Sequence, residues 1–77
     1  MSNGLPKATA EEAIRVVERL GFSVVRQSGS HRIYKNSRGT RVTIPFHAGK
    51  TLHPKVVKAI LRDTGLAPEE FRRLARG

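Results

Sequence analysis

This chain contains no cysteine, so neither a disulfide nor a thiolate metal site can stabilise it. It has no run of apolar residues near the ~20 that a membrane-spanning helix requires. Its first residues lack the apolar stretch of a secretory signal peptide. A glycine-rich phosphate loop is also missing, and we expect no cofactor. With 77 residues there is room for one small core. We therefore expect a single cytoplasmic domain without membrane contact.

Acidic residues are scarce, and their distribution is uneven. The chain has 15 lysine and arginine residues against 6 aspartate and glutamate residues, a formal net charge of +9. No acidic residue lies between Arg26 and Lys58, so the centre of the chain is purely cationic. Such an excess on a small domain indicates a polyanionic partner such as a nucleic acid. The alternative is a basic surface that is merely well solvated.

Apolar periodicity and helix-start signals predict two helices and a short third one. Thr9 and Glu12 have the spacing of a capping box, and apolar residues follow at steps of three and four, so we expect a helix over residues 10–20. Pro54 suits the first position of a second helix, and Pro68 can open the third.

Three short strands are predicted between the first two helices. Their expected ranges are residues 22–27, 30–35 and 40–45. The connections between them are short, which favours an antiparallel meander. The order α-β-β-β-α, with a short additional helix, predicts an α+β two-layer sandwich in which helices cover one face of a three-stranded antiparallel sheet. We expect residues 1–8 to be a flexible leader and residues 9–77 to form the single domain.

The stretch from Gly29 to His47 carries the candidate chemistry. His31 stands at the mouth of the second predicted strand. Beside it are Gly29, which permits a close approach of a ligand to the backbone, and Ser30, a hydroxyl donor. Four cations follow within the next ten positions: Arg32, Lys35, Arg38 and Arg41. Because histidine exchanges protons near neutral pH, this pattern indicates a general acid or base set among phosphate-binding cations.

Several of these side chains also have a plainer interpretation. His31 shares the strand parity of Ile33, which equally allows a ring turned toward the core. His47 is a second acid/base group, a phosphate ligand or an ordinary loop residue, and His53 stands where a helix N-cap is expected. Tyr34 either stacks a base on the open side of the sheet or packs across the strand. Without cysteine or a central carboxylate, we expect no zinc site built from the histidines.

Several short motifs together resemble the HicA toxins of bacterial and archaeal toxin–antitoxin pairs. The matching residues are Gly21-Phe22, Gly29-Ser30-His31, Gly39-Thr40-Arg41-Val42-Thr43-Ile44-Pro45 with His47, Ile60-Leu61, Gly65-Leu66 and Glu69-Glu70-Phe71. The resemblance implies a fold similar to the double-stranded-RNA-binding domain. It also implies a ribosome-independent endoribonuclease that acts on mRNA and is neutralised by a HicB antitoxin. The catalytic histidine of the family corresponds to His31. Arg32 stands where many members carry a second histidine or another polar residue.

The resemblance and the residues together suggest a metal-independent mechanism in which His31 acts on a ribose 2′-OH. The RNA-binding residues that we expect are Gly29, Ser30, Arg32, Lys35, Arg38, Arg41, His47 and Lys50. The expected partners are mRNA and a HicB-like antitoxin, with no small-molecule cofactor. The alternative is a non-catalytic RNA-binding module of the same fold, because double-stranded RNA is recognised largely through its shape and phosphates. DNA binding is a third option, which a salt-controlled competition would address.

Overall fold

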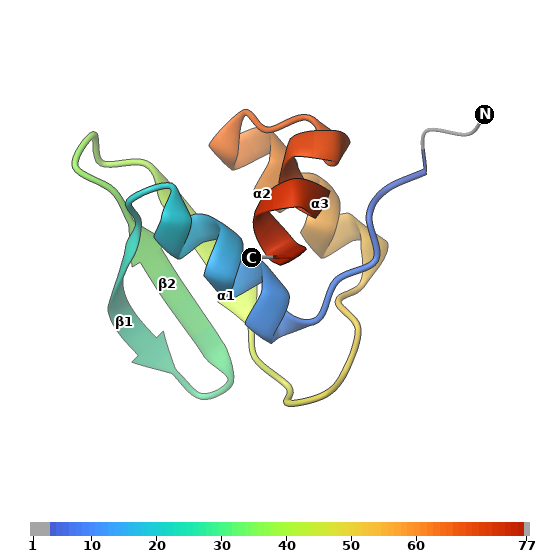
Figure 1. The fold of residues 1–77 in the computed structure, drawn as a ribbon. Helices are drawn as coiled ribbons and strands as arrows, with labels where there is room; N and C mark the ends of the chain where they lie inside the picture. The colour runs from blue at the N-terminus through green and yellow to red at the C-terminus, as the bar shows by residue number, and fades with distance from the viewer. Residues whose placement is uncertain (1–3, 77) are drawn as a thin grey trace.

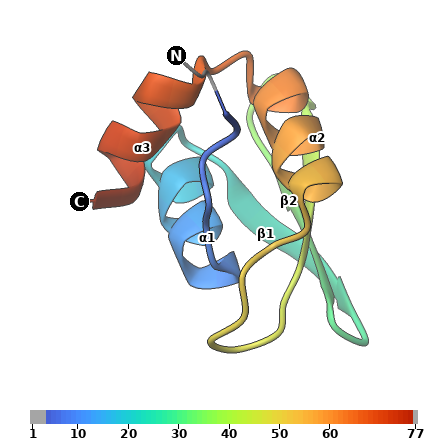
Figure 2. The same ribbon diagram turned by 90° about the vertical axis from the view of Figure 1, so that its right-hand side faces the viewer.

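The computed structural model of the chain describes residues 4–76, and its elements follow the predicted order. They are α1 (Ala10–Arg19), β1 (Ser23–Ser28), β2 (His31–Lys35), β3 (Arg41–Pro45), α2 (Pro54–Thr64) and α3 (Pro68–Arg76). The helices gather against the sheet in both views (Figures 1 and 2). The predicted α+β class with a three-stranded antiparallel sheet is confirmed.

Local side-chain chemistry sets the helix ends. At α1 the Thr9 hydroxyl accepts a hydrogen bond from the Glu12 amide (3.2 Å) and the Glu12 carboxylate accepts one from the Thr9 amide (2.8 Å), so the predicted capping box is formed. At α2 the Nδ1 atom of His53 accepts from the Lys55 amide at 3.0 Å, which confirms His53 as the N-cap. Gly65 ends α2 in the left-handed conformation at φ 77°, where glycine carries no steric penalty.

The sheet is an antiparallel meander in the order β1-β2-β3. Gly29, at φ 58°, occupies the first central position of the two-residue turn between β1 and β2. A type II′ hairpin turn has glycine at this position. A bulge between Val24 and Arg26 shifts the register of β1, and Ser28 comes to lie opposite His31. The strand boundaries agree with the predicted ranges to within one residue.

Alternation along β2 and β3 separates a helix-facing side from an open side. Tyr34, Val42 and Ile44 are at most 2% exposed and belong to the core. Both α1 and α2 contact β3, and α3 packs against α1. The helices and the α1–β1 connection contribute, among others, Ala13, Val16, Val17, Phe22, Val57, Ile60 and Phe71 to this core. Side chains one position away from the buried ones along β2 and β3 point to the open side of the sheet.

The segment before α1 is packed against the fold from Gly4 onward. Pro6 and Ala8 are buried, and the Ala8 carbonyl accepts a hydrogen bond from the Leu52 amide at 2.7 Å. Figure 2 shows this segment, in dark blue, passing between α2 and α3. Residues 4–8, part of the flexible leader expected over residues 1–8, contribute apolar contacts and a backbone pairing here. Residues 1–3 lie outside the described residues.

Candidate nucleic-acid interface

His31 is exposed on the open side of the sheet, at the start of β2. Side chains three positions apart on a strand point to opposite faces of the sheet. Because Tyr34 is buried under the helices, His31 points to the open side. The cross-strand partners of His31 are Ser28 on β1 and Pro45 on β3. In the described part of the chain no side chain forms a hydrogen bond or an ion pair with the His31 ring. The imidazole therefore reaches solvent and not the core, and it is available to a ligand.

Three rows of cross-strand neighbours make up the open side, which we call the open face. The rows are Ser28, His31 and Pro45, then Arg26, Ile33 and Thr43, then Ser23, Lys35 and Arg41. Along β2, Lys35 lies four positions after His31, a span of about 13 Å at 3.3 Å per residue. The open face thus carries a proton-transfer group at one end and three cations beyond it.

The cations of the open face have no protein partner in the described part of the chain. Arg26, Lys35 and Arg41 are exposed, and none of their side chains forms an ion pair or a hydrogen bond with residues 4–76. Within that range the ion pair present joins Arg62 and Asp63 on α2, at 3.3 Å. A polyanion that approaches the open face would therefore meet positive charge that no carboxylate neutralises.

Arg32 lies on the helix-facing side, apart from His31, Lys35 and Arg41. Its guanidinium carbon is 4.0 Å from the centroid of the Phe46 ring, a cation–π contact. Phe46 in turn packs against the core. The Nε atom of Arg32 is buried and has no hydrogen-bond partner among residues 4–76. The structure therefore separates Arg32 from the cations with which the sequence groups it.

The other predicted binding residues fall at the two ends of the open face. Gly29 and Ser30 form the turn beside the candidate imidazole, and a Cβ placed on Gly29 would meet open space. His47 and Lys50 lie in the loop that follows β3, at the same end. Arg38 lies in the turn after β2, at the opposite end. The structure thus gathers most of the predicted residues around one face but spreads them along its length.

A recess of about 240 Å³ opens beside the end of β3. It is lined by Pro45, His47 and Lys50, together with His53, Val56 and two loop residues between them. His53 holds its imidazole at the start of α2 through the N-cap hydrogen bond. The His47 ring has no hydrogen-bond partner among the described residues, so this recess joins a free imidazole to a free ammonium group.

Sequence reasoning missed Arg26 and Ser28 as members of the open face. Their place depends on the bulge after Val24, which shifts the alternation of β1, and the sequence carries no clear signal for a bulge there. Tyr34 is 2% exposed, so of its two interpretations the structure supports packing within the fold and not base stacking.

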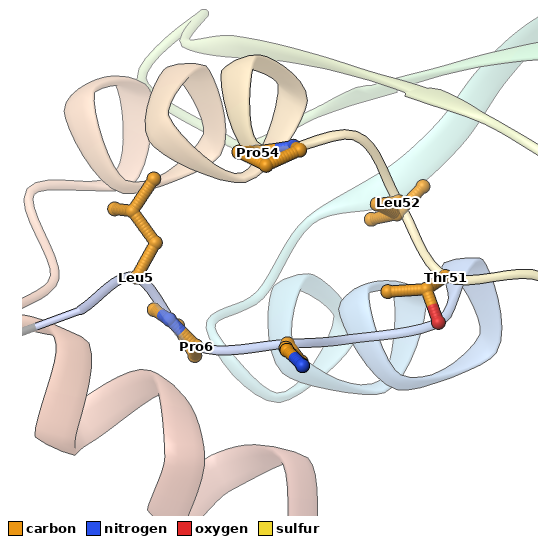
Figure 3. Close-up of a pocket in the computed structure, with 6 residues that line it drawn as sticks. Leu5, Pro6, Thr51, Leu52 and Pro54 are labelled. Atoms are coloured by element: carbon orange, nitrogen blue, oxygen red, sulfur yellow. The ribbon is translucent and has the colours of Figure 1, made fainter.

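A larger groove lies between the N-terminal segment and the start of α2 (Figure 3). It measures about 480 Å³ and is lined mostly by apolar groups, including Leu5, Pro6, Leu52 and Pro54. Neither His31 nor His47 lines it. We therefore take the open face, and not this groove, as the candidate site.

Two further properties concern the described residues as a group. No cluster of three or more histidine, aspartate or glutamate side chains among residues 4–76 is arranged to hold a metal ion. None of the helices within the same range has the length and apolar character to cross a membrane.

Comparison with known proteins gives a result that is independent of the geometry. Residues 10–66 match the model of a family described as "HicA toxin of bacterial toxin-antitoxin". The matched range begins with α1 and ends just after α2, so it contains the whole open face and His31. A comparison with curated proteins finds no match.

Proposed function

Because this chain belongs to the HicA toxin family of toxin–antitoxin systems, we propose that it is the toxin of a type II system and a ribosome-independent endoribonuclease that cleaves cytoplasmic mRNA. The observation that carries this proposal is the exposed imidazole of His31, at the end of a face whose cations have no partner in the described part of the chain. Free cations suit a phosphate backbone, and an imidazole suits proton transfer from a ribose hydroxyl.

Each group on the open face has a role in the proposed reaction. Phosphates of the RNA are held by Arg26, Lys35 and Arg41. The turn at Gly29 lets the RNA strand come close to the protein backbone. His31 takes the proton of a ribose 2′-OH, and O2′ attacks the adjacent phosphorus. The bond from phosphorus to O5′ then breaks, which leaves a 2′,3′-cyclic phosphate and a 5′-OH end. A general base accelerates such a step by about 10²–10⁴-fold. The remainder of the rate enhancement comes from positioning of the RNA and from charge stabilisation by the cations.

The His31→Ala variant tests this function. We expect it to lose cleavage of RNA and to keep RNA binding, because His31 supplies chemistry while the cations supply affinity. Cleavage is followed on end-labelled RNA with analysis of the product ends, and binding by fluorescence anisotropy. Parent cleavage should persist in a chelator, since the proposed step uses no metal.

His53→Asn is the matched control for this experiment. It removes an imidazole but keeps a good N-cap side chain, so its cleavage should equal that of the parent. Equal cleavage by His31→Ala and the parent would remove His31 from the mechanism. RNA binding without cleavage by the parent would leave the non-catalytic RNA-binding module as the function.

We also propose that the partner is a HicB-like antitoxin that presents acidic groups to the open face and covers His31. Toxins of this family pair with antitoxins, and the free cations of the open face support an acidic partner. The product of the neighbouring open reading frame should co-purify with the chain and inhibit cleavage. Arg41→Glu should weaken that association, whereas Arg73→Glu on α3 should not. Failure of the product to bind and to inhibit would contradict this partner.

A further inference from the structure

We propose that His47 is the general acid of the cleavage step and acts across the scissile phosphate from His31. This inference rests on the proposed function. It concerns the proton that the leaving O5′ atom needs, which a base at His31 does not supply. An alkoxide leaves slowly unless a positioned side chain protonates it in the transition state. A second imidazole near the first one would complete the reaction.

His47 lies just beyond the strand pairing that carries His31. Pro45 is the cross-strand partner of His31, and the Phe46 amide still donates to the Ser30 carbonyl at 2.6 Å. Directly opposed residues are about 5 Å apart, and two residues of extended chain cover about 7 Å. The α-carbons of His31 and His47 therefore lie within roughly 12 Å of each other. Two imidazole side chains with a phosphodiester between them can bridge that span.

β3 ends at Pro45, and its alternation, continued over the next two residues, would put the His47 ring on the same side of the sheet as the His31 ring. Ile44 is buried in the core, and Phe46 packs against the core beneath Arg32. Pro45 and His47 alternate with these two residues and line the same recess. Both views place the β1–β2 turn and the loop after β3 at one end of the molecule (Figures 1 and 2).

The remaining histidine near the site and the carboxylates of the described chain are engaged or distant. His53 is held at the helix end, because its Nδ1 accepts the Lys55 amide hydrogen. The described carboxylates all lie on the three helices, and that of Glu11, which reaches the loop after β3, accepts a backbone amide hydrogen there at 3.4 Å. The turn that carries His47 is closed by a bond from the Lys50 amide to the His47 carbonyl at 3.1 Å. The Lys50 ammonium lines the same recess and suits a phosphate oxygen.

The complete step balances in atoms and protons. His31 accepts the proton of the 2′-OH while the bond from O2′ to phosphorus forms. The bond from phosphorus to O5′ breaks while His47 donates its proton to O5′. One proton is taken up and one is released, and the two rings end in exchanged protonation states. Proton exchange with solvent restores both rings for the next turnover.

An RNA with a sulfur leaving group tests this role of His47. The probes are an oligoribonucleotide that the parent cuts at one mapped bond, and the same oligoribonucleotide with sulfur in place of the bridging 5′ oxygen at that bond. A thiolate leaves without being protonated. We expect His47→Ala to cut the ordinary RNA about 10²–10⁴-fold more slowly than the parent. The same variant should cut the sulfur-containing RNA at nearly the parent rate, whereas His31→Ala should be slow on both.

A control variant and the two substrates together distinguish a general acid at His47 from a binding or positioning residue. Arg73→Gln on α3, a change away from the open face and the recess, should match the parent on both substrates, and thermal unfolding verifies that each variant is folded. Slow cleavage of both substrates by His47→Ala would make His47 a binding or positioning residue, and unchanged cleavage of ordinary RNA would give it no role. Either result overturns the proposal but leaves the proposed nuclease standing. A parent that cuts no RNA would overturn the nuclease itself.

Discussion

The face of the sheet to which a cationic side chain of β2 points decides whether it can bind a phosphate or packs within the fold. Arg32 turns to the helix-facing side and packs on the Phe46 ring, whereas Lys35 is exposed on the open face. The cation–π contact of Arg32 is worth about 0.5–2 kcal/mol. Its buried Nε lacks a hydrogen-bond partner in the described part of the chain, and an unpaired buried donor costs about 1–3 kcal/mol. The two contributions largely cancel, so we expect Arg32 to pack within the fold with little net effect on the free energy of unfolding. The cations of the open face are the ones that we expect to bind phosphates.

Salt-dependent RNA binding distinguishes these two kinds of cation. In a His31→Ala background, the added Arg41→Ala change should reduce the slope of log affinity against log salt by about 0.7, the value for one single-strand phosphate contact. The Arg32→Ala change should leave the slope unchanged. The measurement is an anisotropy titration of labelled single-stranded RNA between about 50 and about 200 mM salt. Arg73→Ala on α3 is the control, and an equal loss of slope for Arg32→Ala and Arg41→Ala would contradict the assignment.

The elements of this fold differ in how far neighbouring residues determine them. The ends of α1 and α2 were predictable because Thr9, His53 and Gly65 act on backbone groups within a few residues of themselves. The open side of the sheet was not predictable from β2, because its two alternating sets both contain an apolar residue, Ile33 in one and Tyr34 in the other. Packing of the helices selects the set that is buried, and that choice is a tertiary effect.

Some parts of the candidate site are determined by local sequence and others by contacts between distant residues. His31 and the cations of β2 and β3 are visible as a charged stretch around one imidazole. Arg26 belongs to the open face because of a bulge in β1, and Arg32 is kept apart from the cations of that face by its contact with the Phe46 ring. The packing of residues 4–8 depends on partners such as Leu52, far along the chain. Contacts between distant residues leave no local pattern to read.

The capping box of α1 gives a prediction at the scale of one element. Thr9→Ala should lower the free energy of unfolding by about 1 kcal/mol, because the Glu12 amide loses its hydrogen-bond acceptor. Thr9→Ser keeps that acceptor and should cost far less. Urea denaturation followed by circular dichroism measures both values. An Ala variant as stable as the Ser variant would show that the Thr9 hydroxyl contributes nothing to the stability of the folded state.

The whole molecule combines a high charge with a small volume. A formal net charge of +9 is carried by a fold with a radius of gyration of 11.6 Å. The ion pair between Arg62 and Asp63 is exposed, and such pairs contribute little to stability. Repulsion among the cations therefore opposes folding, and only solvent ions or a polyanionic partner relieve it. The charge that serves binding is thus a cost to the unbound fold.

Salt should therefore stabilise this protein when it is alone. Raising sodium chloride from about 0.01 M to about 1 M shortens the screening length from about 30 Å to about 3 Å and weakens the repulsion. A relief of about 1 kcal/mol would raise the melting temperature by about 4–8 °C for a domain of this size, as calorimetry would detect. A variant with Lys55, Lys58 and Arg73 changed to Gln should show a smaller rise, because these exposed cations add to the repulsion. A melting temperature that falls with salt would mean that favourable charge pairs outweigh the repulsion.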